Sequence, residues 1–333
     1  MPTIDVIAIG NAIVDVMAPA DEASIERLGL AKGGMTLVDT ARAQELYDAM
    51  GPAKEISGGS AANTLAGLAA LGASCEFIGQ VADDQLGEVF AHDIRAGGIS
   101  FETPARPVTG DNGPPTARCL IFVTPDGQRT MNTFLGASQF LPATALDEAA
   151  IASAKILYLE GYLWDPEEPR AAMRRAIDAA RGGGAKVAFT LSDAFVISRH
   201  GDDFRTLIDT GQIDILFANH VELAALTGLD DFEAGLAALA PKVPVLVVTC
   251  GADGAVALSA GDRARVPAEP IAKVVDTTGA GDLFAAGFLA GHVAGKDLET
   301  CLTMGAVAAA EIISHYGARP EADLQALVAK RLG

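Results

Sequence analysis

Residues 276–282 read DTTGAGD and run directly into the small-residue segment LFAAGFLAG at residues 283–291. A glycine-rich turn that opens a helix leaves unpaired backbone N–H groups at the positive end of the helix dipole, and such a site favours a phosphate. Gly279 and Gly281 have no Cβ, so the backbone can approach the anion closely. Asp282 then lies in the first turn of the helix, beside the bound anion.

A carboxylate at this place can act as a general base in phosphoryl transfer. It accepts the proton of an attacking hydroxyl while the N–H groups stabilise charge on the transferred group. An isolated G-x-G-D tetrad is also compatible with an N-capping Asp after a flexible turn. The complete heptad with its glycine-containing helix is far more specific and favours the catalytic interpretation of Asp282.

Short apolar runs of β-type composition recur along the rest of the chain, at residues 6–9, 156–159, 187–190, 213–217 and 245–249. Ala-rich amphipathic segments between them, such as residues 169–180 and 231–240, have the period of helices. This alternation predicts an α/β fold with a doubly wound, mostly parallel sheet flanked by helices.

Two segments, residues 16–56 and 105–137, interrupt that rhythm and are predicted to form a small lid domain. The alternating run at residues 116–123 is followed by the turn residues TPDG at 124–127, which predicts a β-hairpin. Residues 1–15, 57–104 and 138–333 are then assigned to a large α/β domain that binds nucleotide and substrate.

The overall charge excludes some classes of partner. There are 24 Lys and Arg and 43 Asp and Glu residues, so the formal net charge is 24 − 43 = −19. Such a chain repels nucleic acid and anionic membrane surfaces, and we expect neither as a partner. Its four cysteines form no C-x-x-C pair, and no run approaches a membrane-spanning length. We therefore expect reduced thiols and a cytoplasmic location.

A second glycine turn, SGGSAAN at residues 57–63, also runs into a helix of small residues. Asn63 lies early in that apolar helix, where its amide must find a partner, and a polyol hydroxyl suits it. Asp15 follows the first strand, at the edge where open α/β sheets bind ligands, and can bind two vicinal hydroxyls. Tight helix packing and a solvated loop Asp are the alternative interpretations.

Both motifs resemble the signatures of the ribokinase-like (PfkB) family of carbohydrate and nucleoside kinases, and the resemblance spans nearly the whole chain. It implies a ribokinase-like fold with a small β lid and an ATP-dependent kinase activity. Asp282 would be the catalytic base, and Gly279, Ala280 and Gly281 would form the anion hole. The implied acceptor-binding residues are Asp15, Gly59 and Asn63, with Asn11 beside them.

The resemblance also implies a nucleotide side. Asn219 and Glu222 match an N-x-x-E element that shapes the Mg²⁺–phosphate environment, with Glu222 acting on Mg²⁺ through water; a helix cap completed by a capping box fits the same spacing. The implied nucleotide contacts are Thr249, Gly251, Gly254, Thr277, His315 and Asp276, the last near ATP or a monovalent cation such as K⁺. A simple β-turn also explains the two glycines after Thr249.

Arg129 follows the predicted hairpin turn on the lid. Lid closure would bring its guanidinium onto the transferred phosphate or the substrate, although a solvated edge-strand charge is an equally good interpretation.

Within the family, the chain resembles adenosine kinases more than ribokinases or fructokinases, on GN at residues 10–11, EGYLW at 160–164 and DILFAN at 214–219. Leu37, Tyr162 and Leu163 are candidates for an apolar slot that holds a base. Position 163 departs from the animal enzymes, which have an aromatic residue there. We expect phosphorylation of a 5′-hydroxyl, with ribose, fructose or a related sugar as the alternative acceptor.

Other classes fit less well. The Rossmann G-x-G-x-x-G fingerprint of oxidoreductases and the P-loop motif are both missing. A non-catalytic sugar- or nucleotide-binding protein remains a rival, but it predicts loss of Asp282 or of the glycines, which are retained. The sequence leaves K⁺ dependence open and does not separate a monomer from a homodimer.

Overall fold

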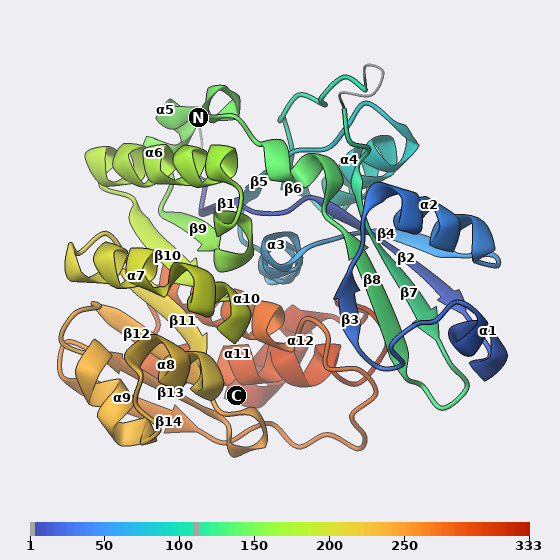
Figure 1. Ribbon diagram of the computed structural model, residues 1–333. Coiled ribbons are helices and arrows are strands. Elements are labelled where there is room, and N and C mark those ends of the chain that lie inside the picture. Colours follow the sequence, from blue (N-terminus) through green and yellow to red (C-terminus); the bar gives the residue numbers. More distant parts are fainter. Residues whose placement is uncertain (1–3, 109–112) are drawn as a thin grey trace.

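The computed structural model describes residues 4–108 and 113–333, and these residues form two β-sheets (Figure 1). The large sheet comprises β1 (Val6–Ile9), β5 (Cys75–Ile78), β6 (Ile99–Ser100), β9 (Ile156–Glu160), β10 (Lys186–Thr190), β11 (Ile215–Asn219), β12 (Val245–Thr249), β13 (Ala255–Ser259) and β14 (Asp262–Val266). Its spatial order is β14-β13-β12-β11-β10-β9-β1-β5-β6. In this spatial order, all neighbours from β12 through β9, β1 and β5 to β6 pair in parallel. Strands β13 and β14 add an antiparallel edge. The predicted mostly parallel sheet is confirmed.

The alternation of side chains along β1 explains why helices cover both faces of this sheet. Val6 and Ala8 belong to one buried cluster, and Ile7 and Ile9 belong to another, because successive strand residues point to opposite faces. The helices beside the large sheet that contribute to the first cluster are α3 (Ser60–Ala70), α4 (Gln85–Ala96), α10 (Ala280–Val293), α11 (Leu298–Ile312) and α12 (Leu324–Leu332). Those of the second are α5 (Glu148–Ser153), α6 (Glu167–Gly183), α7 (Ala194–Asp209), α8 (His220–Thr227) and α9 (Phe232–Leu239).

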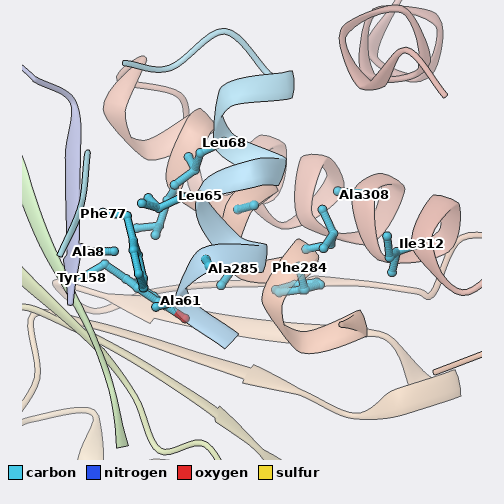
Figure 2. Packing of buried hydrophobic residues seen from close by; sticks show 14 of the residues in the cluster. Ala8, Ala61, Leu65, Leu68, Phe77, Tyr158, Phe284, Ala285, Ala308 and Ile312 are labelled. Carbon is cyan, nitrogen blue, oxygen red and sulfur yellow. The ribbon is translucent and has the colours of Figure 1, made fainter. Parts of the chain in front are cut away.

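Helices α3 and α10 lie side by side in the first cluster (Figure 2). Leu65 of α3 packs with Phe77 and Tyr158 of the sheet, while Phe284 of α10 packs near Ile312 of α11. The close approach depends on glycine, since a Cβ on Gly67 would lie 2.5 Å from Leu283 Cδ1. The two motif helices are therefore held against each other by the core.

The small sheet has the order β3-β8-β7-β2-β4 and lies beside the large sheet (Figure 1). Its strands are β2 (Ile13–Pro19), β3 (Met35–Leu37), β4 (Lys54–Gly58), β7 (Ala117–Val123) and β8 (Arg129–Phe134), and it is accompanied by α1 (Glu22–Arg27) and α2 (Thr40–Ala49). The predicted β7–β8 hairpin is confirmed. Strands β2 and β4 extend beyond the predicted lid segments, into residues 13–15 and 57–58.

Short 3₁₀ turns complete the described elements: η2 (Gly136–Phe140), η3 (Ala143–Ala145), η4 (Gly161–Trp164) and η5 (Gly251–Asp253). Within the described ranges, none of the helices combines the length and the apolar character that crossing a lipid bilayer requires.

Candidate active site

The turn before α10 has the backbone geometry of an anion site. Gly279 adopts a φ of +79°, and a Cβ there would lie 2.9 Å from the Cβ of Ala318, so glycine is required on both counts. A Cβ on Gly281 would meet no described atom within 4 Å, so this backbone faces open space. The N-cap residue of α10 is Gly279, which has no side chain to cap the helix. The positive end of the helix is thus available to an external anion.

Asp282 lies in the first turn of α10 and contacts the first turn of α3. Ser60 Oγ donates a 2.6 Å hydrogen bond to Asp282 Oδ1, and Asn63 Nδ2 donates one of 3.0 Å to Oδ2. Burial raises the pKa of Asp282, while these two donors and the charge of Arg319 oppose the rise. A carboxylate whose pKa is raised is a stronger proton acceptor than an exposed one.

Asp15 and Gly59 line the same cleft as Asp282. The φ of Gly59 is +98°, and a Cβ there would lie 2.2 Å from the carbonyl oxygen of Asn11. This glycine lets β4 turn directly into α3 and so presents Asn63 to Asp282. Burial raises the pKa of Asp15 to about 6, against the charges of Arg129 and Arg319.

The cleft lies between the two sheets and has a volume of about 520 Å³. The predicted site residues that line it are Asp15, Gly59, Asn63, Tyr162, Asn219, Glu222, Thr249, Thr277, Gly279, Ala280, Gly281 and Asp282. The small sheet adds Met35, Cys119, Met131 and Thr133 to the wall. Residues far apart in the sequence therefore meet in one place.

Several predicted residues do not line this cleft: Asn11, Leu37, Arg129, Leu163, Gly251, Gly254, Asp276 and His315. Leu37 is 60% exposed on β3, whereas Leu163 is fully buried in the second core cluster. His315 lines a separate cavity, where its Nε2 lies 3.0 Å from Glu311 Oε1. Gly251 and Gly254 form the turn between β12 and β13, which the bond from Cys250 N to Gly254 O closes.

Asn11 is held inside the protein by Glu160, which begins the EGYLW segment but to which the sequence analysis assigns no role in the site. Glu160 Oε1 accepts 2.7 Å bonds from the N–H and Nδ2 of Asn11, and Oε2 accepts one of 2.8 Å from the N–H of Ala61. Ser138 Oγ donates to Asn11 Oδ1. Burial raises the pKa of Glu160 to about 7. This network ties the end of β1 to the first turn of α3.

Asn219 and Glu222 form the capping box at the start of α8. Glu222 N donates to Asn219 Oδ1 at 2.8 Å, and Asn219 N donates back to Glu222 Oε2 at 2.9 Å. Burial raises the pKa of Glu222 to about 7. Among the described residues, no cluster of three or more His, Cys, Asp or Glu side chains forms a metal site. One carboxylate beside a phosphate site fits Mg²⁺, which keeps several waters and uses substrate phosphates as ligands.

Arg129 is buried rather than solvated. Its Nη1 forms an ion pair with Asp276 Oδ2, and each side chain is only 6% exposed. Asp276 also accepts a 3.0 Å bond from Thr278 N and a 3.1 Å bond from Gly317 N. Asp276 thus pairs with one guanidinium and accepts two backbone N–H bonds. The pair joins the small sheet to the turn that carries Asp282.

Sequence reasoning also missed Ser60 and Arg319. Ser60 stands inside the quoted SGGSAAN motif, so its place one residue after a turn glycine was a usable signal. Arg319 follows α11 in a loop and contacts Ala62 and Ser57. The sequence around Arg319 does not indicate these distant partners.

Comparisons with known proteins agree with this geometry. The model of the pfkB family carbohydrate kinases matches residues 27–324. The chain is similar to the adenosine kinase of Sinorhizobium meliloti, with 45% identity, 99% of this chain and 100% of that chain covered, and a TM-score of 0.89. A probable sugar kinase from Rhizobium etli CFN 42 is 43% identical, with 99% of each chain covered and a TM-score of 0.90.

A curated relative, the adenosine kinase of Saccharomyces cerevisiae, is 28% identical over 95% of this chain and 96% of its own length. Together these matches confirm the predicted ribokinase-like α/β fold, with a mostly parallel sheet flanked by helices. The chain belongs to the pfkB family of carbohydrate kinases.

Proposed function

We propose that this protein transfers the γ-phosphoryl group of ATP to the 5′-hydroxyl of a nucleoside, with adenosine as the acceptor. One observation carries the proposal: Asp282 lies in the first turn of α10, beside a helix N-terminus that Gly279 does not cap, and its carboxylate lines the cleft together with Ser60 and Asn63, which donate to it. A proton acceptor and an anion site are thereby brought to one point, as phosphoryl transfer requires.

In this mechanism the acceptor oxygen attacks the γ-phosphorus. Its proton passes to a carboxylate oxygen of Asp282, the new O–P bond forms, and the bond to the leaving ADP breaks. The backbone at Gly279, Ala280 and Gly281 stabilises the charge on the phosphoryl oxygens. Bound Mg²⁺ would add charge neutralisation on the β- and γ-phosphates, with Glu222 holding one of its waters.

The sugar of the acceptor would bind between Asp15 and Asn63. Asn63 Oδ1 is buried and accepts no hydrogen bond from any described residue, so a ligand hydroxyl can satisfy it. Ionised Asp15 can accept from two vicinal hydroxyls. A ribose with free 2′- and 3′-hydroxyls matches this arrangement.

The rest of the wall suits a nucleobase. Met35 and Met131 offer polarizable, adaptable contacts to an aromatic ring, and Tyr162 adds a ring of its own, held by bonds to Ser192. The full-length similarity to adenosine kinases supports the same acceptor. A sugar kinase of the same family is the second candidate, and the similarity to the Rhizobium etli protein favours it.

The test is an acceptor panel. Wild-type protein is incubated with MgATP and adenosine, ribose or fructose, and acceptor-dependent ADP release is measured with product identification by phosphorus NMR. We expect the highest kcat/KM with adenosine and a 5′-monophosphate as product. Faster turnover of a sugar would favour the second candidate, and ATP binding without turnover of any acceptor would favour a non-catalytic binding protein.

A further inference from the structure

The loop between α11 and α12 inserts Arg319 behind the acceptor side of the cleft. Its Nη1 donates a 2.8 Å bond to the carbonyl oxygen of Ala62, in the first turn of α3. Its Nη2 donates a 2.8 Å bond to Ser57 Oγ at the end of β4. Ser57 in turn donates to Asp93 Oδ2 through its N–H at 2.8 Å and its hydroxyl at 2.5 Å. One guanidinium therefore joins three elements.

The segment that Arg319 holds is the one that carries the donors to Asp282. Ala62 lies between Ser60 and Asn63, whose side chains bond the two carboxylate oxygens of Asp282. A shift of this turn by a fraction of an ångström would lengthen both bonds, and catalytic geometry is sensitive on that scale.

Arg319 also has carboxylates on several sides. It lines a cavity of about 310 Å³ that shares Asp15 and Asn63 with the main cleft, so these two residues separate the guanidinium from the acceptor site. Asp93 faces it from α4 and also lines this cavity. A fixed positive charge at this place stabilises the ionised forms of the nearby acids.

The pKa directions agree with that geometry. Burial raises the pKa of Asp282 and of Asp15, and the charge of Arg319 lowers both. For Asp15, Arg129 acts in the same sense. The titratable groups that face Asp282 from the surrounding elements are Asp15 of β2, Tyr158 and Glu160 of β9, Tyr162 of η4, and Arg319.

We propose that Arg319 is a positioning residue of this enzyme: it fixes the first turn of α3 and supplies the positive charge that keeps Asp15 and Asp282 anionic toward the acceptor. This inference rests on the proposed role of Asp282 as the base. It adds a residue that belongs to neither glycine motif and that does not line the main cleft.

The test compares Arg319→Gln with Arg319→Lys across pH, with Arg331→Gln as the matched control. Arg331 pairs with Glu269 outside the cleft, and its loss should leave the profile unchanged. Without the charge, fewer molecules hold an ionised base at low pH, so we expect Arg319→Gln to lower kcat/KM about tenfold at pH 6 and only about threefold at pH 8. Arg319→Lys should keep the wild-type shape of the profile.

A loss in Arg319→Gln that is equal at all pH values, or no loss, would overturn the proposal. If Arg319→Gln does not fold, the pH profile of Arg319→Lys is the test. Lys retains the positive charge, so a shift of the acid limb of its kcat/KM profile would contradict the proposal. If the wild type turns over no acceptor, the proposed function fails separately. In that case the pKa of the Asp282 carboxyl can still be measured by carbon NMR titration of the ligand-free protein. We expect a higher titration midpoint in Arg319→Gln than in wild type, and an unchanged midpoint would contradict the inference.

Discussion

Arg129 and Asp276 form a buried ion pair, so substitutions of the two residues should be strongly coupled in their effects on the free energy of unfolding. Asp276→Asn removes the carboxylate and leaves the guanidinium of Arg129, whose side chain is only 6% exposed, without its ion-pair partner. Its Nε and Nη2 already have no partner among the described residues, so no second acceptor compensates. Removing one member of a buried pair in this way costs about 3–5 kcal/mol of unfolding free energy.

The reverse substitution should cost less. In Arg129→Met, Asp276 keeps the N–H donors of Thr278 and Gly317, so the expected loss is about 1–3 kcal/mol. The double variant contains neither unpaired charge, and its loss should fall about 2–3 kcal/mol short of the sum of the single losses.

Urea unfolding followed by far-ultraviolet circular dichroism measures these differences. Arg118→Met is the matched control, because Arg118 is also buried in the small sheet but bonds Gln44 and stacks on Tyr47 without a carboxylate. Combined with Asp276→Asn, it should be additive within about 0.5 kcal/mol. Additivity of the Arg129→Met and Asp276→Asn losses would refute the pair as a link between the small sheet and the catalytic turn.

Three further outcomes follow from the site. Gly59→Ala should raise the acceptor KM and destabilise the protein by about 2 kcal/mol or more, because of the positive φ and the contact with Asn11 O. Gly182→Ala is the matched control: it lies in helix α6, where a Cβ would meet no described atom within 4 Å, and should stabilise the protein by at most about 1 kcal/mol in denaturant melts. The pKa of Asp15 is about 6 and its ionised form binds hydroxyls, so the acceptor KM should rise as the pH falls below about 6 and stay constant above it. A KM that is flat with pH, or the same dependence in Asp15→Asn, would count against that role. Glu222→Gln should need more Mg²⁺ for half-maximal activity, while its free energy of unfolding falls by at most about 1–2 kcal/mol. If the Mg²⁺ titrations of activity for wild type and Glu222→Gln superimpose, the magnesium role of Glu222 is excluded.

Much of the fold could be predicted because its signals are local. Strands β1 and β12 begin and end at the predicted residues, since each is an uninterrupted apolar run. Strand β11 begins at Ile215 rather than at residue 213, because the carboxylate of Asp214 accepts a bond from Val187 N. Strands β5 and β6 were not predicted: β5 is the short CEFI, which contains Glu76, and β6 has only two residues.

The catalytic part of the site could also be predicted, since the glycines and Asp282 are neighbours in one motif. Glu160 could not, because its partners Asn11 and Ala61 lie 149 and 99 residues away. Arg319 is a stronger case, with partners 257 and 262 residues away. Arg129 follows the hairpin turn as predicted, but only the fold shows that Asp276 faces it.

The most direct test of the account compares single-turnover phosphoryl transfer from ATP to adenosine in wild type and Asp282→Asn, with the ATP Kd measured in parallel. Asn keeps the shape of the side chain and loses the proton acceptor. We expect the transfer rate to fall by about 10²–10⁴-fold, with ATP bound about as tightly as in wild type. Transfer at close to the wild-type rate in Asp282→Asn would contradict the assignment of Asp282 as the base.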